Sequence, residues 1–135
     1  MKLSTKGRYS LQTVVYLATC TENCSIRKIS EKTGISSGYL EQLMIPLRRA
    51  NLVVAQRGVH GGYKIARSGI TCHDVLAASE GDFLPAPCRD CTQHQLCKTH
   101  EIWSLLQRTV VEFSKEVTIE SLASELVIAL KEAEA

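Results

Sequence analysis

The chain of 135 residues has little of what marks disordered, fibrous or membrane proteins. It contains three prolines and eight glycines, and 44% of its residues are hydrophobic against 22% charged. That balance is typical of a globular protein and excludes a disordered one. No stretch reaches the roughly 18 apolar residues that a transmembrane helix needs, and no internal repeat is visible. The sequence therefore predicts one domain of ordinary size with some additional helix, and no membrane partner.

The most apolar segment near the start, residues 11–20, imitates the hydrophobic part of a secretory signal. Gln12 and Thr13 interrupt it, however, and its apolar residues recur at helical spacing. We therefore expect an amphipathic core helix there, and a cytoplasmic protein whose thiols stay reduced. In that compartment, clustered cysteines favour metal ligation or redox chemistry over structural disulfides.

The net charge of +2 conceals a strong asymmetry between the two halves of the chain. Residues 1–68 carry eleven basic and three acidic groups, whereas residues 69–135 carry five basic and eleven acidic groups. The first half is thus +8 and the second −6. A basic half suits a polyanion such as double-stranded DNA, although charges can also cluster by chance on solvated helices. We expect a DNA-binding domain over 1–68, and a cluster-binding loop with a helical dimerisation region over 69–135, within one compact chain.

The first half has the pattern of a winged helix-turn-helix. Helices are expected over about residues 8–20, over 25–34, and from Ser36 onward, with Ser and Gly at the positions that cap helices. The third helix buries one apolar stripe, made of Leu40, Leu43, Met44 and Leu47. A short helix, a glycine turn and a second helix form a helix-turn-helix. The β-prone runs of residues 52–66 then predict a hairpin with a glycine-rich tip, the wing.

The third helix and the wing offer side chains suited to reading DNA. Gln42 can bond adenine in two places and Glu41 can accept from cytosine, while Arg48 suits the phosphate backbone. Arg57 on the wing suits the minor groove or a phosphate, and Gly61 allows close approach of the main chain. The predicted DNA-binding residues are Lys6, Ser37, Tyr39, Glu41, Gln42, Arg48, Arg57 and Gly61. Each of them taken alone is most often an ordinary solvated group.

The second half predicts three further helices. A capping box at Thr71–Asp74 begins a short one, a long one begins near Thr99, and the last begins near Thr118. The long helix carries a continuous apolar stripe, made of Ile102, Leu105, Leu106, Val110, Phe113 and Val117. Since no sheet is available to cover it, we expect it to pack against a second copy, forming a homodimer, rather than on its own winged domain. The predicted fold class is mainly α with a small β-hairpin: a winged helix-turn-helix domain plus a long C-terminal dimerisation helix.

A cysteine-rich loop precedes the long helix. Its spacing is C-x2-C-x5-C-x2-H, formed by Cys88, Cys91, Cys97 and His100. Three thiolates and an imidazole can hold tetrahedral zinc or an iron–sulfur cluster, and the spacing leaves both open. His94 is an alternative to His100, and unbound reduced thiols are a third interpretation. The remaining cysteines, Cys20, Cys24 and Cys72, are expected to be buried and inert.

Several ordered motifs resemble the IscR/NsrR/CymR family of winged-helix regulators, over nearly the whole chain. They are MKLSTKGRY (1–9), IS (35–36), YLEQL (39–43), LRRANLV (47–53), RG (57–58) and GGY (61–63). Within the family, the loop ending in CKTH (97–100) and followed by Trp103 most resembles IscR, the regulator of iron–sulfur cluster assembly.

The resemblance implies a homodimer with one [2Fe–2S] cluster per subunit. The implied ligands are Cys88, Cys91, Cys97 and His100, and the implied base contacts are Glu41, Gln42 and Arg57. IscR-like proteins usually separate the first two cysteines by five residues, whereas two separate them here. NsrR-type members take an acidic ligand from the position that Arg8 occupies, and an arginine cannot ligate iron. CymR-type members resemble this chain only outside the cysteine loop.

The sequence therefore predicts a transcriptional regulator and not an enzyme. We expect a repressor-type protein that binds a pseudo-palindromic operator and senses iron–sulfur or redox status through a [2Fe–2S] cluster. One alternative is a winged-helix regulator with structural zinc or thiol-based sensing. The other is a small iron–sulfur electron-transfer protein, which the recognition helix and basic half argue against because electron transfer needs neither.

Overall fold

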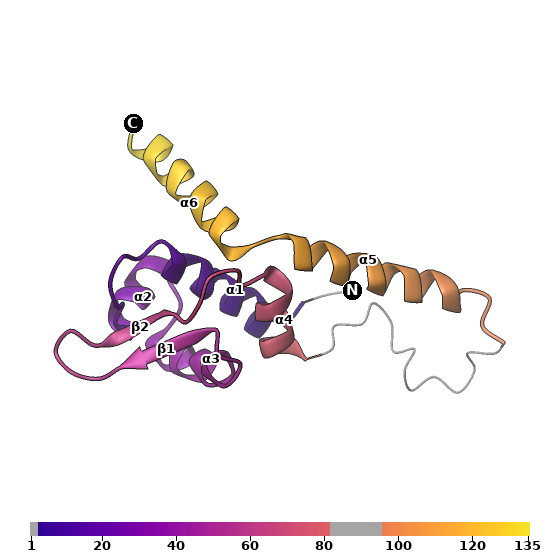
Figure 1. The fold of residues 1–135 in the computed structure, drawn as a ribbon, viewed down its shortest axis with the longest axis horizontal. Helices are drawn as coiled ribbons and strands as arrows, with labels where there is room; N and C mark the ends of the chain where they lie inside the picture. Colours follow the sequence, from indigo (N-terminus) through magenta and orange to yellow (C-terminus); the bar gives the residue numbers. More distant parts are fainter. Residues whose placement is uncertain (1–2, 82–95) are drawn as a thin grey trace.

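A computed structural model describes residues 3–81 and 96–135 (Figure 1). Within these ranges the elements are α1 (Thr5–Ala18), α2 (Ile26–Thr33), α3 (Ser37–Arg49), β1 (Val53–Gln56), β2 (Gly62–Ile65), α4 (Cys72–Glu80), α5 (His100–Glu116) and α6 (Ile119–Glu134). The strands pair antiparallel, with Val53 opposite Ile65 and Gln56 opposite Gly62. The mainly α fold with one small hairpin is the fold class that the sequence predicts.

The helix-turn-helix forms where its capping residues place it. Ser25 caps α2 by accepting a hydrogen bond from the Lys28 amide, and Ser36 caps α3 by accepting from the Tyr39 amide. Between the two helices, Gly34 takes a φ of 77°, a left-handed conformation that favours glycine. The turn predicted from these residue types is therefore present, and it fixes the angle at which α3 leaves α2.

The N-terminal helix starts earlier than the apolar pattern predicts, at Thr5 instead of near Arg8. The Glu80 carboxylate, at the end of α4, accepts hydrogen bonds from the amides of Ser4 and Gly7, each at 3.0 Å, and from the Ser4 hydroxyl. The Ser4 side chain also caps the helix. A carboxylate at a helix N-terminus accepts hydrogen bonds from the free amides there, and its negative charge interacts favourably with the positive end of the helix dipole. This contact extends α1 and ties it to α4.

Replacing Glu80 with Ala is expected to lower the free energy of unfolding by about 1–3 kcal/mol, because the exposed Ser4 amide and the part-buried Gly7 amide lose a charged acceptor. Urea denaturation of the two proteins measures the difference. Glu22→Ala, which removes an exposed loop carboxylate, is the matched control and should change stability by a few tenths of a kcal/mol at most. Equal stability of Glu80→Ala and the unsubstituted chain would contradict the capping role.

One hydrophobic core joins the two halves of the chain. The buried stripe of α3 packs with Val14 and Leu17 of α1, and the second half adds Ile70, Val75 and Ile119. All three are at most 1% exposed. The start of α6 and the middle of α4 are thus part of the same core as the winged helix.

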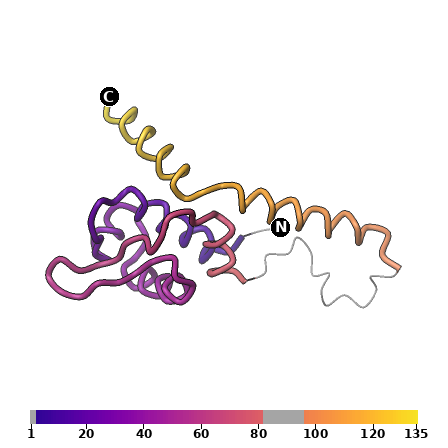
Figure 2. Tube along the Cα trace, in the orientation of Figure 1, coloured from indigo at the N-terminus to yellow at the C-terminus, as the bar shows by residue number. Residues whose placement is uncertain are grey.

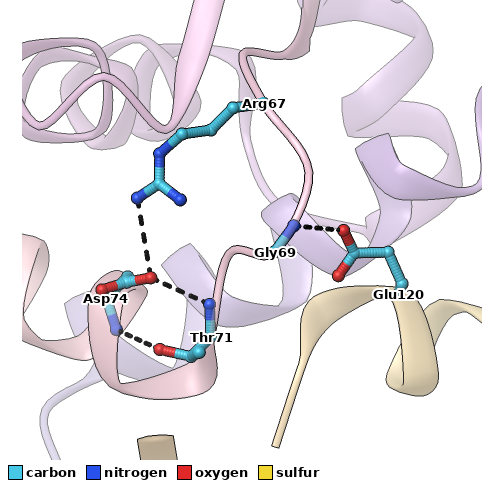
Figure 3. A network of polar contacts seen from close by, with 5 residues as sticks. All are labelled: Arg67, Gly69, Thr71, Asp74 and Glu120. Atoms are coloured by element: carbon cyan, nitrogen blue, oxygen red, sulfur yellow. Dashed lines mark hydrogen bonds and ion pairs between the residues drawn. The ribbon is translucent and has the colours of Figure 1, made fainter.

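A polar network holds the joint between these parts (Figure 3). Arg67 pairs with Asp74 at 3.6 Å, Asp74 and Thr71 form the predicted capping box, and the Gly69 amide donates to Glu120 of α6 at 2.7 Å. Backbone bonds from Cys72 to Val117 and from Ile119 to Ile70 lie beside it. Together these contacts fix where α5 ends and α6 begins.

Helix α5 packs against α4 (Figure 2), and four residues of the predicted apolar stripe are exposed on its open side. The buried Ser114 hydroxyl lies 3.4 Å from His73 Nδ1 of α4. On the open side, Ile102, Leu105, Leu106 and Phe113 are 46%, 51%, 40% and 66% exposed. Across the described part of the chain, no helix combines the length and the apolar character that crossing a membrane requires.

Candidate nucleic-acid interface and cysteine segment

The outward side of α3 is the centre of the candidate interface. Because Leu40, Leu43, Met44 and Leu47 are buried, the opposite side of the helix is left to solvent. Glu41 and Gln42 are exposed there, and Ser37 is exposed at the first position of the helix, seven residues before the buried Met44. Arg48 is also exposed but lies eleven residues after Ser37, roughly 16 Å along the helix. The structure thus groups the predicted base-reading residues and separates Arg48 from them.

The start of α1 lies beside the start of α3. The rings of Tyr9 and Tyr39 meet edge to face, with centroids 5.9 Å apart, and Thr5 and Ser36 line one shallow surface pocket with them. Lys6 is exposed next to this contact. Tyr39 is half-buried, so its ring is a packing group in addition to any phosphate contact. The contact between Tyr9 and Tyr39 brings the charge of Lys6 to the N-terminal end of α3, the helix expected to read DNA bases (the recognition helix).

The wing is anchored by a residue that the sequence pattern does not reveal. Asn23 Nδ2 donates to Gln56 Oε1 at 2.7 Å and to the His60 carbonyl at 3.2 Å. Arg57 follows β1 directly and is exposed. Since Asn23 precedes α2, it fixes the hairpin relative to the helix-turn-helix and so sets where Arg57 lies.

The glycine at the wing tip serves the hairpin itself. The Gly61 amide donates to the Gly58 carbonyl at 3.0 Å, and a Cβ on Gly61 would collide with the Gln56 carbonyl. Gly61 is also only half exposed. This internal role is sufficient to explain a glycine at position 61, whereas Val59, two residues earlier, is 97% exposed at the tip.

Cys97 and His100 stand at the entrance to α5. Cys97 is exposed and His100 is the first residue of the helix. The Cys97 sulfur lies 3.4 Å from the Thr99 hydroxyl, which accepts a hydrogen bond from the Trp103 indole at 3.1 Å. The indole can only donate, so the Thr99 proton is left for the sulfur. Hydrogen bonding from the Thr99 side chain, and from the amides of Thr99 and His100, lowers the pKa of Cys97.

The other members of the predicted ligand set cannot be placed in the same way. Cys88, Cys91 and the alternative His94 fall in 82–95, outside the described residues. Among residues 3–81 and 96–135, no three His, Cys, Asp or Glu side chains gather closely enough to hold a metal ion. Cys24 is buried as expected, whereas Cys20 and Cys72 are only half-buried.

The basic first half of the chain, the solvent-exposed side of α3 and the hairpin anchored by Asn23 together define a DNA-binding winged-helix protein of the transcription-regulator class. A family model described as "Rrf2: Iron-dependent Transcriptional regulator" matches residues 3–125. The chain belongs to the Rrf2 family.

Named relatives and solved structures agree with this assignment. The chain is 34% identical over 132 residues to the HTH-type transcriptional regulator IscR of Vibrio vulnificus, covering 93% of this chain and 79% of that one. The structure of CymR, the global cysteine regulator of B. subtilis, superposes with a TM-score of 0.78 at 35% identity and covers 93% and 98% of the two chains. T. potens IscR gives a TM-score of 0.75 at 29% identity, covering 100% and 92%.

The chain is therefore a helix-turn-helix transcriptional regulator related to both IscR and CymR, as the sequence predicts. Such proteins are DNA-binding regulators and not enzymes. Similarity to IscR and to CymR is comparable, so the comparisons leave the nature of the sensed signal open between an iron–sulfur cluster and a thiol.

Proposed function

We propose that this chain is a homodimeric, cytoplasmic regulator of the IscR type, which reads iron–sulfur or redox status through a [2Fe–2S] cluster. The cluster ligands would be Cys88, Cys91, Cys97 and His100. The observation that carries the proposal is the arrangement at the start of α5, where an exposed cysteine with a lowered pKa stands three positions before a histidine.

The two placed residues fit such a group. The ligand form of cysteine is the thiolate, which the hydrogen bonds at Cys97 favour. A [2Fe–2S] cluster supplies a one-electron redox couple when it is bound. Thr99 and Trp103 lie just outside the proposed ligands, and such neighbours hold ligands in orientation and tune the reduction potential of a cluster.

The segment that carries the proposed ligands, residues 88–100, lies in the sequence between α4 and the start of α5, and this position links it to both halves of the protein. Its N-terminal side follows Glu80, whose carboxylate binds the start of α1 beside Lys6. Its C-terminal side leads into α5 with the exposed apolar stripe. We propose that ligation biases an element with two arrangements, and so shifts which DNA sites bind well. The division at residue 68, between a DNA-binding domain and a dimerisation region, is part of this proposal.

Dimerisation through α5 would place two recognition helices about a two-fold axis. Dimeric helix-turn-helix proteins bind half-sites one or more helical turns apart, so a pseudo-palindromic operator is expected. The exposed side chains of Leu105 and Phe113 support the proposal, because a run of large apolar groups on one helix face is typical of a contact surface.

The DNA contacts can be tested one by one at the operator. Gln42→Ala and Arg57→Ala should each weaken binding by about 1–3 kcal/mol and relax preference at particular base pairs. Lys6→Ala should weaken all sequences alike and reduce the salt slope by about one. Lys131→Ala, which removes the same charge from the end of α6, is the matched control. Footprinting of Arg57→Ala at physiological salt that matches the unsubstituted protein would contradict the wing contact.

A second candidate function rests on the likeness to CymR. In that case the chain would be a winged-helix regulator that senses through thiols or carries structural zinc. The visible absorption spectrum of protein prepared without oxygen separates the candidates. Charge-transfer bands with two irons per subunit support the cluster, whereas a colourless protein, with or without stoichiometric zinc, supports the second candidate.

A further inference from the structure

Two cysteines outside the proposed ligand set meet at the base of the winged helix. The Sγ atoms of Cys20 and Cys24 are 2.6 Å apart. A disulfide bond measures about 2.0 Å, so the two sulfurs need only a small displacement to bond. Both side chains are free thiols. The proposed cluster uses neither of them.

The backbone holds this pair from both ends. After α1, the Cys20 amide donates to the Leu17 carbonyl at 3.0 Å. Cys24 is bonded to the wing, donating its amide to the Tyr63 carbonyl at 2.9 Å and accepting from the Tyr63 amide at 2.8 Å. Gly62 packs so closely on Cys24 that a Cβ would lie 2.5 Å from the Cys24 carbonyl carbon. These backbone contacts hold the two sulfur atoms close together.

The two thiols differ in access. Cys24 is 0% exposed, and burial, followed by the contact with Cys20, raises its pKa to about 11. Cys20 is half-buried and lines a surface pocket of about 330 Å³, together with Lys64 and Arg67. A small oxidant can therefore reach Cys20, while Cys24 remains protonated behind it.

Tyr16 completes the surroundings of the pair. Burial, and then the neighbouring Cys20 and Cys24, raise the pKa of Tyr16. A tyrosine hydroxyl is protonated at neutral pH even at its ordinary pKa, so it is a hydrogen-bond donor beside the two sulfurs. The Tyr16 carbonyl lies 3.6 Å from the Cys20 sulfur.

We propose that Cys20 and Cys24 are a redox modification site, which a hydroperoxide converts to an intramolecular disulfide. The Cys20 thiolate attacks one peroxide oxygen, the O–O bond breaks, and the departing oxygen takes a proton to leave as water or an alcohol. The Cys24 sulfur then attacks the Cys20 sulfenic acid, forming the S–S bond and breaking the S–O bond. The hydroxide that leaves combines with the Cys24 proton as water. Two thiols lose two electrons in total, which reduce the peroxide, and a thiol reductant reverses the change.

The structural consequence falls on the elements that contact DNA. Cys24 precedes Ser25, the cap of α2, and its backbone pairs with Tyr63 of β2 in an isolated antiparallel bridge. A crosslink between residues 20 and 24 joins the end of α1 covalently to this point. The site thus lies between the body of the domain and the wing, independent of any metal bound by the cysteine loop.

The test uses the full chain treated with hydrogen peroxide at one equivalent per subunit, followed by alkylation and proteolysis. Trypsin cleaves after Arg8 and Arg27, so one peptide carries Cys20 and Cys24 and no other cysteine. We expect this peptide to lose the mass of two hydrogen atoms and to resist alkylation until it is reduced. A second cleavage after Glu22 should leave two fragments joined only by the disulfide. Since the readout is confined to this peptide, it does not depend on whether the cysteine loop holds a cluster.

Three variants make the result decisive. Cys24→Ser should leave Cys20 as a sulfenic acid that a dione reagent traps, because the resolving thiol is absent. Cys20→Ser should slow oxidation of Cys24 many-fold, because Cys24 is buried. Cys72→Ser, which removes a half-buried thiol of α4, should leave disulfide formation unchanged. Recovery of Cys20 and Cys24 as alkylated thiols or as sulfinic acids, without the linked fragments, would overturn the proposal.

Discussion

The double substitution Leu106→Asp and Phe113→Asp is expected to convert the protein to monomers and to abolish operator binding at physiological salt. Leu106 and Phe113 lie on the same side of α5, seven residues apart, and are 40% and 66% exposed in the single chain. If this side meets a second copy, each Asp becomes a buried charge without a partner, which costs several kcal/mol. Two such charges per subunit should therefore prevent the contact. Sedimentation velocity measures the change in mass.

A control on the same helix separates the interface from the charge itself. Arg108→Asp changes the net charge by the same two units, but Arg108 is exposed on the opposite side of α5. It should leave the dimer intact. Circular dichroism must show that the double variant keeps its helices, since the substituted side chains are not part of the buried core. A folded double variant that still sediments as a dimer would place the interface elsewhere.

The sequence predicts this fold well because most of its signals are local. Ser25, Ser36 and Thr71 each cap the helix that follows them, and Gly34 takes the left-handed conformation expected of a helix end. These residues act through backbone groups a few positions away, so their effect can be inferred from the sequence alone. The start of α1 was predicted too late, because the local Ser4 cap was overlooked and the Glu80 carboxylate that also binds the first amides comes from 76 residues further along the chain.

In the candidate interface, too, the residues that depend on local patterns could be predicted and those that depend on distant contacts could not. Glu41 and Gln42 could be inferred because the apolar stripe of α3 leaves only one side of the helix for them. Asn23 could not, since a single asparagine in a loop has no periodic pattern, and its partners Gln56 and His60 depend on how the wing folds back. Nothing in a spacing of four, from Cys20 to Cys24, indicates that their sulfurs meet after the helix ends.

The environment of Cys97 could be predicted only in part. Thr99 is the residue directly before α5 and Trp103 follows four residues later, a separation that places two side chains on one helix face. The hydrogen bond between them was therefore open to prediction once the helix start was known. The contact of the Thr99 hydroxyl with the Cys97 sulfur could not be predicted, because it depends on the irregular backbone between residue 97 and the start of the helix.

Replacement of the proposed cluster ligands is expected to give the second large effect. Ala at Cys88, Cys91 or Cys97 should abolish the visible absorption and reduce iron from two atoms per subunit to a trace, because a [2Fe–2S] centre has four terminal positions and loses one. Cys72→Ala, outside the loop, is the control and should retain full iron content. Iron analysis and the absorption spectrum, both after anaerobic reconstitution, measure the outcome.

His100 distinguishes this ligand set from one made only of thiolates. An imidazole adds less negative charge than a thiolate, so it should raise the reduction potential of the centre. His100→Ala is therefore expected to give a labile or absent cluster, and His100→Cys a more stable cluster of lower potential. Because His100 is the first residue of α5, neither substitution removes a core contact, and the helical content should not change. Full and stable iron content in His100→Ala would rule out the imidazole ligand and direct attention to His94. Loss of the cluster in His100→Ala together with its recovery in His100→Cys would instead require a ligand at the first position of α5, since only a donor side chain there distinguishes the two variants.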